Sequence, residues 1–277
     1  MTVVPEKIKE TSKKFWGHNP AGWTFGDGHQ KGSKEFFDAV LDKRYTYECD
    51  WLDEIVQFKR LKNKKVLEIG FGGGYDAYLF CKNGAEYTGV DITAENKILA
   101  EQHLQYYDFK PSFLTMDAEK ITWENEFDYI YSFGVLHHTP NMQQALNNCY
   151  KALKKEGEAQ IIVYYKYSIF YMLSVVLNEW ILRGGFRKRS LKEQRSLIEY
   201  TQSTEKPLVN VYSKKQLHKM LKNAGFKIIK TDIRKLVHED LPGIRFIGRL
   251  RKYMPQTILN KLSKYFGWYL SVRAIKE

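Results

Sequence analysis

The chain has 277 residues, enough for one large α/β domain with insertions and a sizeable buried core. Hydrophobic residues make up 43% of it and charged residues 27%, which is ordinary for a soluble globular protein. The three cysteines are widely spaced and form no C-x-x-C pair, which argues against a disulfide framework or a zinc cluster and favours a reducing compartment. Residues 1–16 lack the apolar core of a secretion signal, so we expect a cytoplasmic location.

Charge is unevenly distributed along the chain. Residues 201–277 hold 17 basic and 5 acidic residues, a net charge of +12, whereas residues 1–200 hold 27 of each. The excess indicates an anionic partner, such as a nucleic acid, lipid headgroups or a phosphorylated substrate. It is equally consistent with solvated lysine faces that bind nothing.

Residues 1–60 are expected to form an N-terminal cap ahead of the first strand. A lysine-rich helix over about 5–15 leads into a loop, Trp16 to Trp23, that is dense in aromatic and turn residues. This segment is predicted to be either a flap packed on the core or a lid that keeps water from a reaction. His18 lies in the loop and is one candidate catalytic residue. A further helix is expected over 36–47.

A strand, a glycine-rich turn and a helix follow. Val66 to Ile69 form an apolar run that is too short for a helix and predicts a buried parallel strand. Three glycines at alternate positions then predict a tight turn with exposed N–H groups; they are Gly70, Gly72 and Gly74. A helix over about 75–83 and a strand over 86–90 lead to Asp91, whose carboxylate can accept hydrogen bonds from both hydroxyls of a ribose.

The glycine turn fits two classes of ligand site. A dinucleotide site requires G-x-G-x-x-G, but Tyr75 stands where the third glycine should fall. The pattern present is E-x-G-x-G-x-G, from Glu68 to Gly74, and it resembles motif I of the class I S-adenosylmethionine (SAM)-dependent methyltransferases. The resemblance implies that SAM is the cofactor and that Asp91 binds its ribose.

The next two strands carry further site candidates. Thr93 is expected to cap a helix that runs to about residue 106. A strand over 112–115 ends before Asp117. The resemblance implies that this carboxylate accepts a hydrogen bond from the adenine amino group; the alternative is that it caps the following turn. A strand over 127–132 leads into V-L-H-H, ending at His138, which resembles the branch of the family with the ubiquinone and menaquinone-type methyltransferases.

Strands and helices alternate up to residue 164, with a helix over about 142–153 and a strand over 158–164. This alternation predicts a parallel sheet. Three segments beyond residue 212 also resemble the family's C-terminal half; they are a helix over 214–223 and strands over 226–231 and 267–274. The expected fold is therefore α/β, a Rossmann-like, doubly wound sheet of seven strands with an antiparallel edge. The methyltransferase domain is expected to span residues 61–277.

Two insertions, residues 165–212 and 235–265, are expected to cover the substrate. Tyr167 to Leu182 is apolar, but it is too short and too interrupted by polar residues for a membrane span, so no stable membrane insertion is expected. Four basic residues follow between Arg183 and Arg189. Such a segment can lie in a membrane interface, wall a pocket for an apolar substrate, or simply pack on the sheet. We favour a cap helix that also lines the substrate pocket.

The resemblance carries the cofactor contacts to specific positions. The candidate SAM-binding residues are Glu68, Gly70, Phe71, Gly72, Gly74, Asp91, Ile92, Asp117, Ala118, Ser132, Phe133 and His137. Arg44 and Tyr45 either reach the carboxylate of SAM or form a surface ion pair and a core aromatic. His138 and His18 are the candidate general bases for a protonated acceptor. No metal site is expected, because the seven histidines show no paired ligand spacing with a carboxylate.

These features predict a SAM-dependent methyltransferase that acts on an O, N or C atom of a small-molecule acceptor of lipophilic, aromatic or sugar-like character. One alternative is a methyltransferase that acts on RNA or protein through the basic residues 201–277. Another is a SAM-binding protein without catalysis, or a protein peripheral to a membrane through residues 167–189.

Overall fold

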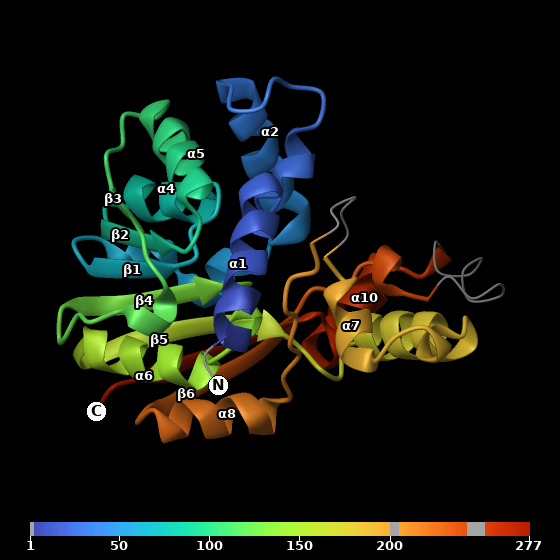
Figure 1. Cartoon of the computed structure of the whole chain (residues 1–277). Coiled ribbons are helices and arrows are strands. Elements are labelled where there is room, and N and C mark those ends of the chain that lie inside the picture. The colour runs from blue at the N-terminus through green and yellow to red at the C-terminus, as the bar shows by residue number, and fades with distance from the viewer. Residues whose placement is uncertain (1–2, 200–204, 243–252) are drawn as a thin grey trace.

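The computed structural model describes residues 3–199, 205–242 and 253–277. In these residues a sheet of seven strands runs through the molecule and carries helices on both faces (Figure 1). The strands lie in the order β3-β2-β1-β4-β5-β7-β6. Their bounds are β1 Lys65–Ile69, β2 Glu86–Asp91, β3 Ser112–Thr115, β4 Phe127–Phe133, β5 Leu153–Tyr164, β6 Lys227–Arg234 and β7 Tyr269–Ile275. Strands β1 to β5 are parallel, which confirms the predicted doubly wound fold.

The antiparallel strand, β7, lies one position in from the edge of the sheet. It pairs with β5 on one side and with β6 on the other, antiparallel to both. Most of β7 is buried, whereas in β6 only Ile233 is. The charged strand therefore takes the edge, where charged side chains discourage pairing with another chain. The expected antiparallel pairing is present, but the edge strand itself runs in the direction of β1 to β5.

The helices cover the two faces of this sheet. The α-helices are α1 Val3–His18, α2 Lys34–Lys43, α3 Leu52–Val56, α4 Tyr75–Lys82, α5 Ala94–Gln105, α6 Met142–Ala152, α7 Leu191–Ser196, α8 Lys214–Asn223 and α10 Gln256–Phe266. Helices α6 and α8 pack on one face, through buried residues such as Leu146 and Leu217. Helices α4 and α5 and the N-terminal segment pack on the other, through residues such as Phe80 and Leu104. The hydrophobic cores on the two faces cover the sheet, and the parallel pairing of the strands brings the residues at their carboxyl ends to one edge.

Three local features differ from the expectations. Helix α1 continues to His18, so the segment that begins at Trp16 is helical before it becomes a loop. The helix expected over 36–47 ends at Lys43 and is followed by a π-helical turn, η2, Arg44–Glu48. The first two residues of this turn, Arg44 and Tyr45, both bond to the carboxylate of Asp76. Thr93 precedes α5 as expected, but its hydroxyl caps nothing among the described residues.

The insertion after β5 forms the π-helix η6, Phe170–Leu182, and then α7. In Figure 1, η6 is the yellow helix that extends beyond the sheet near α10. Residues 200–204 and 243–252 of the two insertions lie outside the described residues. Within the described ranges, none of the helices combines the length and the apolar composition that a membrane span requires. The boundary between cap and main domain at residue 60 stays a prediction.

Candidate active site

A cavity of about 270 Å³ lies at the carboxyl ends of the parallel strands. It is lined by the segments that follow β1, β2, β3 and β4, and by residues of α1. Ligands bind at this place in open α/β sheets. Where the strand order reverses, here between β1 and β4, the connections that follow the two strands leave toward opposite faces and open a crevice. The cavity extends to Tyr164 and Glu199, which belong to the end of β5 and to the insertion beyond it.

The turn after β1 requires glycine at its first position. Gly70 has φ of +82°, and a Cβ there would lie 2.1 Å from the Val135 side chain. Any larger residue would therefore combine backbone strain with a steric clash. Gly72 donates its N–H to Asp91 at 3.0 Å, and a Cβ on Gly72 would meet no atom within 4 Å. The turn thus leaves open space directly beside the Asp91 carboxylate.

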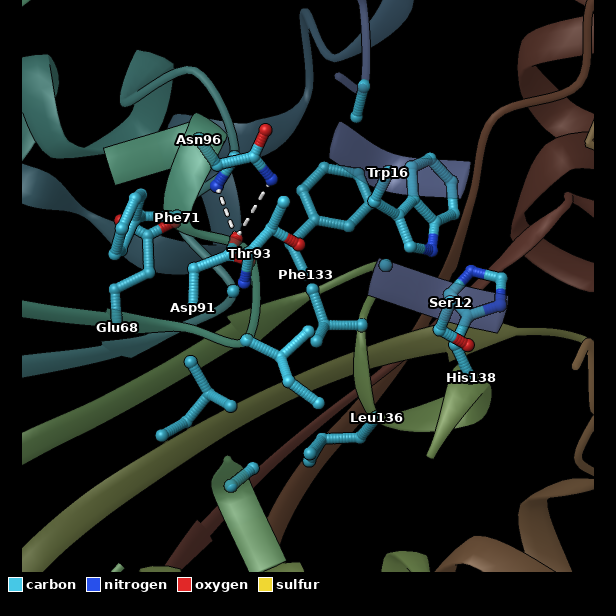
Figure 2. Close-up of a pocket in the computed structure, with 18 of the residues that line it drawn as sticks. Ser12, Trp16, Glu68, Phe71, Asp91, Thr93, Asn96, Phe133, Leu136 and His138 are labelled. Atoms are coloured by element: carbon cyan, nitrogen blue, oxygen red, sulfur yellow. Dashed lines mark hydrogen bonds between the residues drawn. The ribbon is translucent and has the colours of Figure 1, made fainter. Parts of the chain in front are cut away.

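Asp91 is buried at the end of β2 and is held by three donors. Besides Gly72, it accepts from the N–H of Thr93 at 2.9 Å and from Asn96 Nδ2 at 3.3 Å. Figure 2 shows Asp91, Thr93 and Asn96 together on one side of the cavity. Burial raises the pKa of Asp91, although the hydrogen bonds from Thr93 and Gly72 oppose the shift. The sequence predicted Thr93 as a helix cap but gave no sign that it is a partner of this carboxylate.

Glu68 also lines the cavity, and its carboxyl group accepts a hydrogen bond from the Tyr87 hydroxyl at 2.5 Å. Burial, together with the negative charge of Asp76, raises the pKa of Glu68 well above its usual range. Burial thus favours the protonated form of this carboxyl group, which can donate a hydrogen bond as well as accept one.

Arg44 forms a buried ion pair below the cavity rather than a surface pair. Its Nε and Nη2 atoms lie 3.0 and 2.8 Å from the two carboxylate oxygens of Asp76. The hydroxyls of Tyr45 and Tyr131 donate to the same carboxylate, at 2.6 and 2.9 Å. Burial would raise the pKa of Asp76, but the Arg44 charge and these hydrogen bonds outweigh it and hold the pKa below its usual value. Arg44 lines the cavity, whereas Tyr45 does not.

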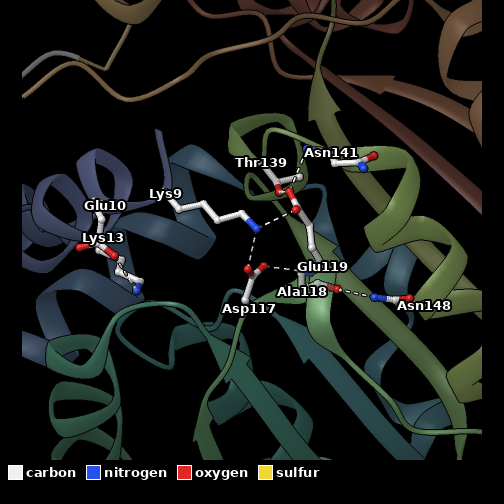
Figure 3. A network of polar contacts seen from close by, with 9 residues as sticks. All are labelled: Lys9, Glu10, Lys13, Asp117, Ala118, Glu119, Thr139, Asn141 and Asn148. Atoms are coloured by element: carbon white, nitrogen blue, oxygen red, sulfur yellow. Dashed lines mark hydrogen bonds and ion pairs between the residues drawn. The ribbon is translucent and has the colours of Figure 1, made fainter. Parts of the chain in front are cut away.

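On the opposite side, Asp117 is bonded to a residue of α1 (Figure 3). Lys9 Nζ lies 2.8 Å from Asp117 Oδ2 and 2.7 Å from Glu119 Oε2. Asp117 also accepts from the N–H of Glu119 and so caps the short helix η4, Ala118–Lys120. Asp117 thus caps the turn, and it also lines the cavity, so capping does not remove it from the site. No local pattern in the sequence identified Lys9 or Glu119.

Helix α1 covers this part of the cavity, to which it contributes Lys9, Ser12 and Trp16. The Trp16 ring centroid lies 5.1 Å from that of His138 (Figure 2). His18, by contrast, is exposed at the end of α1 and does not line the cavity. The helix continues past Trp16, which turns His18 to solvent, so the structure gives this histidine no access to the site.

His138 lies at the end of the cavity away from Asp91. Its Nδ1 lies 2.6 Å from the Leu208 carbonyl oxygen, which can only accept, so Nδ1 carries the proton and Nε2 the lone pair. Burial lowers the pKa of His138 to about 4, which keeps the ring neutral. Nε2 lies 3.7 Å from Glu199 Oε1. Burial raises the pKa of Glu199 to about 7, and the Tyr164 hydroxyl donates to Glu199 at 2.8 Å.

Several predicted residues do not line the cavity. Ser132 is fully buried and donates to the Ile69 carbonyl at 3.2 Å, joining β4 to β1. His137 is also fully buried, against the Tyr164 ring, and Gly74 is the N-cap of α4. The predicted residues that do line it are Arg44, Glu68, Gly70, Phe71, Gly72, Asp91, Ile92, Asp117, Ala118, Phe133 and His138.

The fold also assembles a group of residues that could hold a metal ion. One ligand atom from each of His137, His138 and Glu199 lies within 4.8 Å of the others. Ligand spacing along the sequence gave no sign of this group, because Glu199 comes from a distant insertion.

A family model described as a methyltransferase domain matches residues 41–231. Curated relatives include ubiquinone biosynthesis O-methyltransferases from Pseudomonas putida, 28% identical over 136 residues, and from Glaesserella parasuis, 31% identical over 129 residues. These matches cover 48% and 44% of this chain, and 57% and 55% of the two relatives. The chain thus matches little more than half the length of these relatives.

Solved structures of similar fold match over nearly the whole chain. Magnesium protoporphyrin IX methyltransferase from Synechocystis has a TM-score of 0.58 and 14% identity, and the match covers 98% of this chain and 97% of that one. For 1,6-didemethyltoxoflavin-N1-methyltransferase from Burkholderia thailandensis, the TM-score is 0.53 and the identity 15%, with 100% and 92% covered. At such identities the likeness shows a shared fold.

Proposed function

The chain belongs to the class I SAM-dependent methyltransferases, and from this premise we propose that it transfers a methyl group from SAM to an O, N or C atom of a small-molecule acceptor. One observation carries the proposal. A single cavity joins the buried Asp91 carboxylate at one end to the neutral His138 ring at the other. A cofactor and an acceptor placed at these two ends would meet inside it.

The residues around Asp91 fit SAM. Asp91 would accept hydrogen bonds from the ribose hydroxyls, and the open space at Gly72 would allow the cofactor to approach the backbone. Asp117 would face the adenine amino group, and Arg44 would lie near the carboxylate of the methionine part. SAM supplies an electrophilic methyl group on its sulfonium sulfur.

The protein's main contribution would then be to orient the acceptor. Alignment of two reactants can account for about 7–11 kcal/mol of a reaction barrier. Helix α1, with Trp16, would exclude water from the transfer. His138 Nε2 would take the proton from an acceptor that carries one.

Calorimetric titration tests the cofactor assignment. We expect SAM and S-adenosylhomocysteine to bind the wild-type protein in the micromolar range, and Asp91→Ala to lose this binding. Asp42→Ala is the matched control, because Asp42 is an exposed acidic residue on α2 outside the cavity. Binding of NADH alone would contradict the proposal and return the glycine turn to the dinucleotide class.

We also propose that residues 167–189, in the insertion after β5, contact an anionic membrane surface. Apolar side chains on η6 and beyond are exposed, among them Ile181, Leu182 and Phe186, and Arg183 and Arg187 lie beside them. An apolar face next to basic residues suits a lipid interface with anionic headgroups. Co-sedimentation with phosphatidylglycerol vesicles, but not with phosphatidylcholine vesicles, is the expected result. Equal recovery in the two pellets would contradict the proposal.

Nucleic acid is a less suitable partner for the basic residues 201–277. Four of these residues, Lys227, Lys230, Arg234 and Lys235, lie in ion pairs with carboxylates of the chain. Their charge is therefore partly neutralised.

A further inference from the structure

At the end of the cavity opposite Asp91, His138 Nε2 and Glu199 Oε1 face each other with no hydrogen bond between them. His138 Nε2 carries a lone pair, since Nδ1 donates its proton to Leu208. Nε2 has no hydrogen-bond partner in the described part of the chain. It lies 3.7 Å from Glu199 Oε1, which is too long for a direct hydrogen bond. Both atoms line or border the cavity, so a bound molecule can reach the gap between them.

Glu199 is a partly buried acid, with 14% of its side chain exposed, and it has few hydrogen-bond donors. Its one hydrogen bond within the described ranges comes from the Tyr164 hydroxyl, and no lysine or arginine of those ranges pairs with it. A buried carboxyl group with so few donors is destabilised until another donor reaches it. The same holds for the unpaired lone pair of His138. A hydroxyl placed in the gap would donate its proton to one of the two groups, and an amine with two protons would donate to both.

The cations that line the cavity are already neutralised. Lys9 is paired with Asp117 and Glu119, and Arg44 is paired with Asp76 and lies 3.5 Å from Glu48. No lining cation in the described part of the chain is therefore free to pair with an anionic acceptor. A carboxylate or phosphate at this end would face Glu199 and lone pairs instead of a positive charge.

The surrounding walls are aromatic. Trp16, Phe133 and Tyr164 all line the cavity, and the Tyr164 ring stacks on Trp268 with 4.2 Å between the centroids. The stacking on Trp268 thus restricts the Tyr164 ring, and the Tyr164 hydroxyl donates a hydrogen bond to Glu199. Rigid aromatic walls favour a flat or apolar body on the molecule that bears the donor.

We propose that His138 and Glu199 form the acceptor subsite, and that it takes an uncharged hydroxyl or amine on an apolar or aromatic body and rejects carboxylates and phosphates. This inference rests on the proposed function and deepens it. Glu199, which no sequence pattern identified, becomes the second residue of the subsite.

At this subsite the lone pair of the acceptor oxygen or nitrogen would form a bond to the methyl carbon of SAM. The carbon–sulfur bond would break and leave its electron pair on sulfur. The proton of the acceptor would pass to His138 Nε2, and Glu199 would stabilise the imidazolium that forms.

Binding of small probes tests the subsite without knowledge of the natural acceptor. Protein saturated with S-adenosylhomocysteine is titrated with phenol, aniline, benzoate and phenyl phosphate, and binding is followed by ligand-observed NMR. We expect phenol or aniline to bind and the two anions not to bind, and the comparison of phenol with aniline distinguishes hydroxyl from amine. Glu199→Gln and His138→Asn should each weaken the binding by about tenfold.

Glu179→Gln is the matched control, because it makes the same change in charge in the same insertion on a more exposed side chain outside the cavity. It should leave probe binding unchanged. Preference for the anions, no binding of either protic probe, or variants as strong as the wild type would overturn the subsite. Stoichiometric zinc in the purified protein that is lost in Glu199→Gln would also overturn it, in favour of a metal held with His137. If S-adenosylhomocysteine itself fails to bind, the proposed function fails rather than the subsite.

Discussion

The Lys9 ammonium lies 2.8 Å from the Asp117 carboxylate, although 108 residues separate them along the chain. Through this contact, α1 is fastened to the carboxyl end of β3 beside the cavity. Glu119 extends the contact, since it accepts from Lys9, from the Thr139 hydroxyl at 2.5 Å and from the Asn141 N–H at 2.8 Å. The cap over the cavity is thus joined to two of the loops that form it.

Lys9→Met should loosen α1 and destabilise the fold. It leaves Asp117 and Glu119 close together without their cation, which we expect to lower the free energy of unfolding by about 1–3 kcal/mol. Dissociation of S-adenosylhomocysteine should become faster. Urea unfolding and stopped-flow displacement measure the two effects. Lys13→Met, which breaks an exposed pair with Glu10 on the same helix, should change stability by less than about 0.5 kcal/mol.

His103 should make stability depend on pH. Its Nδ1 bonds the Gly73 carbonyl at 2.8 Å, and burial lowers the pKa of His103 to about 4. Between pH 6.5 and 4 the unfolded chain binds a proton that the folded chain does not, so stability falls as pH falls through this window. The lost stability should approach roughly 3 kcal/mol. The difference in unfolding free energy between the wild type and His103→Phe should therefore become smaller from pH 7 to pH 4. A difference that stays constant over this range would contradict the prediction.

Gly70→Ala should be strongly destabilising because of one neighbour. The added methyl group would clash with Val135, and φ is positive, which together should cost about 2–5 kcal/mol. Gly28→Ala has the same backbone problem at φ +98° but open space, so about 1–2 kcal/mol is expected. In the double variant Gly70→Ala/Val135→Ala the clash is relieved. Thermal unfolding should show that the two changes are not additive, and additive effects would rule out the clash.

Asn96 should influence the pKa of the Asp91 carboxylate. Its amide lies 3.3 Å from Asp91 Oδ2, so Asn96→Asp would place a second acid beside the first and raise the pKa of the pair. We expect SAM affinity to fall by more than about tenfold at neutral pH, and to fall less in Asn96→Ala. Titration calorimetry of both variants is the measurement. Equal affinities in the two variants would exclude the electrostatic explanation.

The site residues that the sequence predicted correctly are those at the end of a strand or directly after it. Gly70 follows β1 directly and Asp91 is the last residue of β2. Parallel strands bring their carboxyl ends together, so the sequence pattern and the topology are enough to place both residues at the cavity. The family resemblance also predicted seven strands in the correct class of fold. The position of β7 inside the edge was not specified, because it depends on which of two strands buries more apolar surface.

The missed residues depend on contacts between distant segments. Glu199 meets His138 only because the insertion after β5 folds back over the cavity. Lys9 looks like any solvated lysine of a basic helix until the fold places two carboxylates against it. His18 was predicted as a site residue because the sequence placed the end of α1 about one turn too early; it lies outside the cavity. The role of His137, in the V-L-H-H segment, could not be predicted either, because the sequence does not show that its side chain is fully buried.

The place of β7 between β5 and β6 also matters while the protein is being made. Residues 165–268 leave the ribosome after β5 and before β7, so the outer edge of β5 has no partner during that interval. β6 is made earlier but hydrogen bonds only to β7, and it has no place in the sheet until β7 follows. Nascent chains with an open apolar edge are prone to aggregate. Synthesis therefore passes through a stage in which the unpaired edge of β5 favours aggregation until β7 is made.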